Sequence, residues 1–519
     1  MKPTTQSARA HAAAAILLVA LSALMLWPLP RLIARAAADP NATLTTAWLH
    51  DAVWHSFDTR VPPPHLVLGI LGVPFRAAGA SPLLTHNLLL VLGFAFSGYA
   101  AFLLTRTVTG SWWAALASGI VFAFVPWRFA QLADTPQVWS GWLPLAAAAA
   151  IAFARRRTWV RGVLLVLAIA MCVATYVTGD DGRLAFPGYG AVILAAIGAI
   201  GPLGRDARLR RLVLFGAIAA ILFGVLVPAR GAVAGYAGLA LLAGIGAMKL
   251  IRHRNVVGLL IAALLVFELR PTPPRFHLID TDVPPVDRFL AETPGGAILE
   301  LPVRPGVTDA EYRFRSTTHH RPTVIEPKLA AAFAGRPIDL AVLDHLNVTT
   351  LVVHADAIVG HEAVAMRDFL LRAVDAGKLR FVARFDRGIE GDYVFETGRG
   401  ETKPFFGPQP LTRPVVWLDE PQRDAEVRGS VRVLGWGLAP AGIKRVRVFV
   451  DNHEEHVDAQ LFPRPDVAAL YPWHDASKAG FTVDIPRRKR EGRVDIEVEV
   501  TDLSGRTVRA PQRWFAWSR

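Results

Sequence analysis

The chain has 519 residues, of which 52% are hydrophobic and only 19% are charged, with a mean hydropathy of +0.34. This composition excludes a wholly soluble protein and a disordered one, because so much apolar surface must be buried or placed in lipid. The single cysteine, Cys172, excludes a disulfide framework and a cysteine-based zinc site. Lys and Arg number 56 against 43 Asp and Glu, an excess that cytoplasmic loops of a multispanning membrane protein explain.

The chain divides near residue 270. Residues 1–270 are long apolar segments with short polar gaps, and residues 271–519 have ordinary soluble composition. A bilayer core about 30 Å thick needs about 20 helical residues to cross it. The apolar segment 65–80 contains Pro74 and Arg76, which favour an interfacial or re-entrant helix. The segments predicted to span are 12–34, 82–105, 112–127, 138–154, 159–178, 186–203, 212–229, 231–249 and 256–269.

Charge predicts the orientation of these nine spans. With the N-terminus inside, fourteen Lys and Arg residues fall in inside loops and seven in outside loops. The positive-inside rule therefore favours a cytoplasmic N-terminus and an extracytoplasmic soluble half, in the inner (plasma) membrane. The beginning of the chain, with Lys2, Arg9 and small residues at 34–36, also resembles a signal peptide. We expect a retained helix, and cleavage would leave the remaining topology unchanged.

The soluble half is predicted to contain two domains. In residues 276–405, the strand patterns 297–301, 350–354 and 379–385 and the helical pattern 361–376 indicate a small α/β domain. Residues 412–519 carry about seven short strand patterns in about 100 residues, which favours an immunoglobulin-like β-sandwich without its cysteines. The predicted strands of this domain are 414–418, 426–437, 443–451, 480–486, 492–501 and 506–516.

Carboxylates in the predicted outer loops are the main candidates for chemistry. Asp39, Asp51 and Asp58 follow the first span, and Asp134 lies between the spans 112–127 and 138–154. A carboxylate there could accept a proton, and a cation such as Arg230 could stabilise a leaving phosphate. The alternative is that these acids are solvated loop residues. The chain contains no phosphate-binding loop, dinucleotide fingerprint, HExxH motif or GxSxG elbow.

Histidines are a second and weaker indication of a functional site, as candidate metal ligands. His50, Asp51 and His55 lie on a predicted short amphipathic helix, where Asp51 and His55 share a face and His50 and His55 could bind a metal. Interfacial histidines are common without a metal. The pairs His319–His320 and His453/His456 are expected to be surface residues, as is the basic run 487–490, which could instead contact anionic headgroups.

Segments of the apolar half resemble the bacterial GT-C type of multispanning membrane glycosyltransferase. The segments are Asn87–Leu90, Phe96–Leu104, Phe122–Ala130 and Trp142–Leu145, with further islands at 227–230, 284–290 and 298–302. The tail resembles a module that some such proteins carry, at 433–437, 464–472 and 479–481. The chain departs from the family pattern at Ala42, which holds the position of an acid, and at Gln131, where relatives often carry His. An abbreviated or degenerate member is therefore an alternative.

The resemblance implies a sugar donor linked to polyprenyl phosphate and catalysis at an outward-facing acidic loop. We expect transfer of the sugar to a cell-envelope glycan, lipid or protein, with Asp39 or Asp51 as the base and Asp134 positioning a metal or the acceptor. Arg230 and His65 are the candidates for the donor phosphate, and a divalent metal is a candidate cofactor. The first alternative is a non-catalytic envelope protein whose β-sandwich binds glycan or protein through Trp473 and His474. A transporter of lipid-linked saccharide is the second, and charges placed between rather than within spans argue against it.

Overall fold

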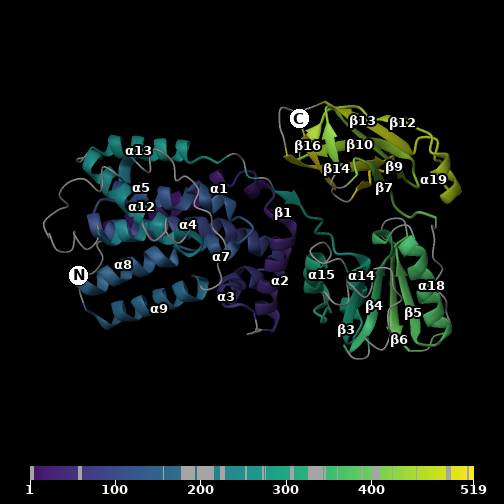
Figure 1. The fold of residues 1–519 in the computed structure, drawn as a ribbon, viewed down its shortest axis with the longest axis horizontal. Coiled ribbons are helices and arrows are strands. Elements are labelled where there is room, and N and C mark those ends of the chain that lie inside the picture. Colours follow the sequence, from purple (N-terminus) through teal and green to yellow (C-terminus); the bar gives the residue numbers. More distant parts are fainter. Residues whose placement is uncertain are drawn as a thin grey trace. The chain divides into compact units, whose positions relative to one another are not determined.

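The computed structural model places the described residues in two compact units, 1–279 and 280–519 (Figure 1). Helices form the first unit almost entirely, and strands dominate the second. The described residues are 5–56, 61–155, 157–176, 193–195, 215–221, 228–251, 254–271, 274, 276–303, 309–324, 343, 346–358, 361–386, 390–398, 400, 410–422, 425–451, 453–486, 492–510 and 513–518.

The helical unit is built around α4 and α5, whose facing side chains form its main core. Ser81 caps α4 by accepting a hydrogen bond from the Leu84 N–H, and Gly110, at φ +72°, ends it. Its elements are α1 (Thr5–Met25), η1 (Leu29–Arg31), β1 (Ala36–Ala37), α2 (Pro40–Ser56), α3 (Pro63–Ala77), α4 (Pro82–Thr109), α5 (Trp112–Phe124), α6 (Pro126–Ala130), α7 (Thr135–Val138), α8 (Trp142–Arg155), α9 (Trp159–Tyr176), α12 (Pro228–Ile251), α13 (Asn255–Glu268) and β2 (His277–Leu278).

Five helical segments of the described residues are long and apolar enough to cross a membrane, by length and composition. They are Ala8–Met25, Pro82–Thr109, Trp112–Ala130, Thr135–Arg155 and Ala232–Ile251. They correspond to five of the nine predicted spans. The predicted spans 159–178 and 256–269 are shorter apolar helices here, and most of 186–203 and half of 212–229 lie outside the described residues. The count of nine therefore stays a prediction.

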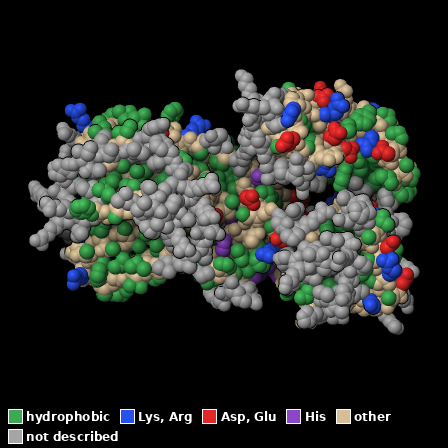
Figure 2. Space-filling model, in the orientation of Figure 1, with side chains coloured by type: hydrophobic (Ala, Val, Ile, Leu, Met, Phe, Trp, Pro, Cys, Tyr) green, Lys and Arg blue, Asp and Glu red, His purple; other side chains and the backbone are tan. Residues whose placement is uncertain are grey.

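The exposed surface of the helical unit is apolar, as expected for contact with lipid. On α13, Val256 is 69% exposed and Phe267 is 78% exposed, and on α9 Trp159 is 79% exposed. Figure 2 shows hydrophobic side chains over much of this unit, whereas acidic and basic side chains are interspersed on the second unit. Large apolar patches of this kind on a helical bundle indicate a membrane protein.

The first helix is shorter than predicted. It ends at Met25 rather than at residue 34, because Pro28 and Pro30 follow and cannot continue an α-helix. The segment after it forms β1, which pairs antiparallel with β2. The Asn87 side-chain amide of α4 donates to the backbone carbonyls of Ile33 and Ala36, both at 2.7 Å, and so fixes this segment.

The first half of the second unit is an α/β sheet with helices on both faces. Strands β3 (Ala297–Leu301) and β4 (Val348–His354) are parallel, and β6 (Asp392–Thr397) and β5 (Leu379–Phe385) complete the order β3-β4-β6-β5. Helix α18 (His361–Asp375) covers the face that carries Leu299, while α14 (Pro285–Glu292) covers the face that carries Ile298. Helix α15 (Asp309–His319) and η2 (Ala355–Ala357) complete this part.

The remainder of the second unit is a two-sheet β-sandwich. One sheet has the order β12-β13-β9-β7, and the other has β11-β10-β14-β16-β8 with β15 paired to β14. Side chains of both sheets share one core. Two predicted strands are interrupted, since Gly429 at φ +86° separates β8 from β9 and β15 ends before β16. The elements are β7 (Val415–Glu420), β8 (Glu426–Arg428), β9 (Val431–Leu438), β10 (Ile443–Val450), β11 (His453–Glu455), β12 (Gln460–Phe462), α19 (Pro465–Leu470), β13 (Gly480–Ile485), β14 (Gly492–Asp502), β15 (Thr507–Arg509) and β16 (Arg513–Ser518).

Candidate functional site

Helices α2, α3 and α4 approach one another closely through glycines. A Cβ atom at Gly69 of α3 would lie 2.7 Å from the Val53 Cβ of α2, and one at Gly72 would lie 3.0 Å from the Thr85 Cγ2 of α4. Because a side chain at either position would collide with the neighbouring helix, these glycines permit the contact. Polar residues of the three helices are thereby brought together inside an otherwise apolar unit.

Three histidines meet at this junction, one from each helix. The His50 ring of α2 lies 6.0 Å, centroid to centroid, from the His65 ring of α3 and 6.0 Å from the His86 ring of α4. His50 and His86 are 3% and 1% exposed. Burial, together with the nearby His86 and His65, lowers the pKa of His50 well below its usual value, so this imidazole is neutral.

The same end of α2 carries a buried carboxylate held by a cation. Asp51 is 3% exposed, and its Oδ1 accepts a hydrogen bond from the Arg76 Nη2 of α3 at 2.6 Å. Its Oδ2 lies 3.3 Å from the His55 Nδ1, one helical turn further along α2. Arg76 also donates to the Ala80 carbonyl, which holds the guanidinium in place.

The segment that carries Asp134 is fixed by a buried arginine. Arg128 is fully buried and donates from Nη1 to the Val138 carbonyl at 2.6 Å and the Ser140 Oγ at 3.0 Å. Asp134 precedes Thr135, whose Oγ1 lies 3.4 Å from the His86 Nε2. Burial raises the pKa of the Asp134 carboxyl, against the effect of the Gln137 backbone N–H. Asp134 thus stands one residue from a contact with the histidine cluster.

The predicted site residues fall into separate groups. Asp39 is exposed and caps α2 by accepting a hydrogen bond from the Ala42 N–H at 2.8 Å. It precedes Asp51 by 12 residues, about 18 Å along a helix at 1.5 Å per residue. Asp58 and the side chain of Arg230 lie outside the described residues, and Arg230 belongs to the first turn of α12.

Two residues of the junction were not among the sequence candidates, Arg76 and His86. Each could have been recognised from the sequence as a polar residue in an apolar segment. Arg76 lies in the segment 65–80, and His86 lies in the predicted span 82–105. Polar side chains within apolar segments usually face other protein groups.

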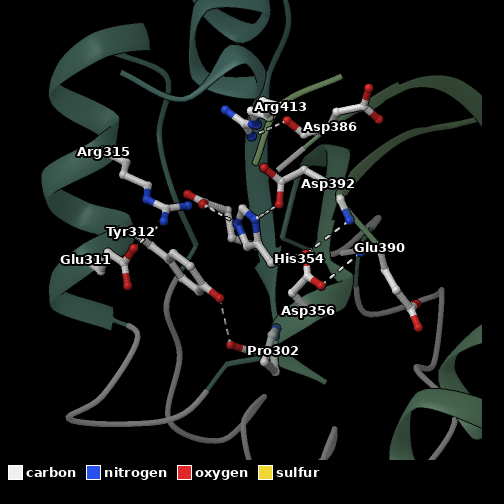
Figure 3. A network of polar contacts seen from close by, with 12 residues as sticks. Pro302, Glu311, Tyr312, Arg315, His354, Asp356, Asp386, Glu390, Asp392 and Arg413 are labelled. Carbon is white, nitrogen blue, oxygen red and sulfur yellow. Dashed lines mark hydrogen bonds and ion pairs between the residues drawn. The ribbon is translucent and has the colours of Figure 1, made fainter. Parts of the chain in front are cut away.

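A second buried polar network lies in the α/β part of the second unit (Figure 3). At its centre, the His354 Nδ1 lies 2.7 Å from the Asp392 Oδ1, and the His354 Nε2 lies 3.0 Å from the Glu300 Oε2. The Tyr312 ring stacks on His354 at 5.2 Å, and the Tyr312 hydroxyl donates to the Pro302 carbonyl. Both ring nitrogens of His354 are occupied by carboxylates, so this ring ties the ends of β3, β4 and β6 together and is not available as a base.

Other sequence candidates of the second unit have structural partners. The His319 Nδ1 accepts a hydrogen bond from the Arg321 N–H, and the His474 Nε2 accepts one from the Leu411 N–H. His319 is 6% exposed, which contradicts the prediction that it is a surface residue, because α15 packs this side chain inward. Trp473 is 55% exposed. The basic run 487–490 lies outside the described residues.

Comparison with known proteins gives limited similarity. No protein-family model and no curated protein matches the chain. Among solved structures, the chain is similar to the arabinofuranosyltransferase AftD from Mycobacteria, with 15% identity and a TM-score of 0.43 over 83% of this chain and 44% of that one. It is also similar to CopC from Methylosinus trichosporium OB3b, with 14% identity and a TM-score of 0.14 over 20% of this chain and 93% of that one. The chain spans less than half the length of the arabinofuranosyltransferase chain.

Proposed function

We propose that the chain is a membrane glycosyltransferase-like protein that transfers a sugar from a polyprenyl-phosphate donor to a cell-envelope acceptor on the outer face of the inner membrane. The observation that carries the proposal is the buried Asp51 carboxylate held between Arg76 and His55, next in sequence to His50 of the histidine cluster, which Thr135, the residue after Asp134, contacts through His86. Such a site combines a proton acceptor with a cation.

In this proposal the acceptor hydroxyl gives its proton to a carboxylate while its oxygen attacks the anomeric carbon. The bond from that carbon to the phosphate oxygen breaks, and the polyprenyl phosphate leaves with the electron pair. Asp51 is the preferred base, since Arg76 keeps a negative charge favourable there. Asp134 positions the acceptor or a metal, and burial raises the pKa of its carboxyl.

The site has a cation whose contacts the structure describes, namely Arg76, which binds Asp51 and the Ala80 carbonyl. It is 15% exposed at the side chain, so it retains access to a ligand. We assign it the leaving phosphate, with His65 of α3 and Arg230 of α12 as the further candidates from the sequence. Asp39 remains the alternative base implied by the family resemblance.

The test uses the full chain purified in detergent with a panel of radiolabelled polyprenyl-phosphate sugars. Asp51→Asn and Asp134→Asn are each expected to lower turnover by about 10²–10⁴-fold, the range of general acid–base catalysis. The matched control is Asp484→Asn, whose carboxylate is two-thirds exposed in a surface ion pair. Asp39→Asn separates the two base candidates, because Asn caps a helix as well as Asp.

Wild-type turnover in Asp51→Asn, with loss in Asp39→Asn, would move the base to Asp39. No turnover with any donor would overturn the transfer reaction. A second function is then favoured by the exposed Trp473, namely glycan binding by the β-sandwich without catalysis. Binding of envelope glycan by the full chain, lost in Trp473→Ala, would support that alternative.

A further inference from the structure

The three histidines of the α2–α3–α4 junction have ring nitrogens without a partner in the part of the chain that the structure describes. Among those residues, both nitrogens of His50, the Nδ1 of His65 and the Nδ1 of His86 are buried and have no hydrogen-bond partner. Buried polar atoms are nearly always hydrogen-bonded, so four such atoms in one cluster require an explanation. The unit is otherwise closely packed here, since Gly69 and Gly72 leave no space for side chains.

Two kinds of ligand would use these nitrogens, an anion or a metal cation. An anion needs protonated imidazoles, but His50 and His86 are 3% and 1% exposed with ring centroids 6.0 Å apart, and two buried positive charges this close repel each other. Neutral imidazoles, in contrast, are preferred ligands of Zn²⁺ and related divalent metals. The chemistry of the cluster therefore favours a metal cation.

The geometry of the rings agrees with this choice. Imidazole nitrogens bind Zn²⁺ at about 2.0–2.1 Å, which places the ring centroids of two ligands about 5–5.5 Å apart. The two centroid distances from His50 are 6.0 Å, so each pair of rings must close by about 0.5–1 Å around a shared ion. The Thr135 hydroxyl near the His86 Nε2 leaves the His86 Nδ1 as the nitrogen available to the ion.

We propose that His50, His65 and His86 form a three-histidine site for a divalent transition metal, with Zn²⁺ as the reference ion. Three protein ligands leave a fourth position for water or a substrate oxygen, as in catalytic zinc sites. The set differs from the pairing of His50 with His55 expected from the sequence, because His55 lies against Asp51. The site does not depend on the proposed sugar transfer.

The test measures metal binding to the full chain in detergent, with Zn²⁺ for affinity and Co²⁺ as a spectroscopic probe. We expect one ion per chain and the intense visible absorption of four-coordinate Co²⁺. His50→Gln, His65→Gln and His86→Gln should each weaken Zn²⁺ binding by more than about 100-fold, beyond the 10–100-fold cost of losing an outer partner. The controls His55→Gln and His453→Gln should bind Zn²⁺ as the wild type does.

A second variant separates loss of a ligand from loss of the fold. His86→Cys replaces an imidazole by a thiolate, which is also a zinc ligand, and should add a thiolate-to-Co²⁺ charge-transfer band in the near ultraviolet. Wild-type affinity in folded His86→Gln, absence of metal binding by the wild-type chain, or loss of binding in His55→Gln would each overturn the site. These experiments measure metal binding and not sugar transfer. A negative result would therefore overturn the metal site without contradicting the proposed transfer reaction.

Discussion

His354 shows how far one environment can change one residue. Burial alone would lower its pKa, but Asp392 and Glu300 raise the pKa of this imidazole to about 9. The Arg315 guanidinium is also buried, and Glu311, Asp287 and other carboxylates raise its pKa. Two cations thus face the carboxylates at the ends of β3, β4 and β6, although the Arg315 charge by itself lowers the pKa of His354.

The pH dependence of the second unit follows from His354. Its pKa rises from 6.5 unfolded to about 9 folded, so its stabilisation is fully present below pH 6.5 and is lost as pH rises through 9. A shift of about 2.5 units corresponds to about 3 kcal/mol at 1.36 kcal/mol per unit. Urea unfolding of residues 280–519 at pH 6 and pH 9.5 measures the difference. His354→Gln should be less stable at pH 6 and should lack this slope; an unchanged slope would contradict the assignment.

At the residue scale, local spacing could be read from the sequence and tertiary pairing could not. Asp51 and His55 are four apart, and the structure places them in contact as the helix period requires. Arg76 lies 25 residues from Asp51, and only the packing of α3 on α2 brings the two together. His86 joins the cluster for the same reason.

At the element scale, the contact of α4 with α5 depends on two glycines. A Cβ atom at Gly119 would lie 2.8 Å from the Gly98 carbonyl oxygen, and one at Gly98 would lie 3.1 Å from the Gly119 carbonyl oxygen. Backbone atoms cannot rotate away as side chains do. Small residues of this kind allow close approach of helices in membranes.

Gly119→Ala should therefore destabilise the helical unit even though alanine is the better helix former. We expect a loss of about 1–3 kcal/mol from overpacking, seen as a lower thermal midpoint of the full chain in detergent. Gly216→Ala is the matched control, because no atom of the described residues lies within 4 Å of the Cβ position of this helical glycine. It should be neutral or gain up to about 1 kcal/mol. Equal effects of the two substitutions would contradict the packing argument.

The sequence located most of these elements but not all of their ends. Hydropathy predicted the spans that became α4, α5 and α12, since a long apolar run is a strong signal. The predicted first span ends nine residues after the end of α1, because its long apolar run outweighs the helix-breaking signal of Pro28 and Pro30. Strand β6 was not predicted at all, and it supplies Asp392 to the buried network.

At the scale of the whole molecule, the second unit has its own cores. The α/β part and the sandwich each enclose a cluster of buried apolar side chains. We expect residues 280–519 to be produced as a soluble, folded protein with a single-step or two-step cooperative unfolding transition. Circular dichroism during urea unfolding measures this. Aggregation or gradual unfolding of this fragment would show that it needs the helical unit.

The short β1–β2 ladder constrains how the chain is threaded through a bilayer. Ala36 pairs with Leu278, Ala37 pairs with His277, and the Ile279 N–H donates to the Arg35 carbonyl. Backbone hydrogen bonds of this kind cannot reach across hydrocarbon, so both strands share one side of the membrane. We therefore expect the chain to make an even number of passages between them and α1 to make one more. This predicts that the residues before α1 and the entry to the second unit face different compartments.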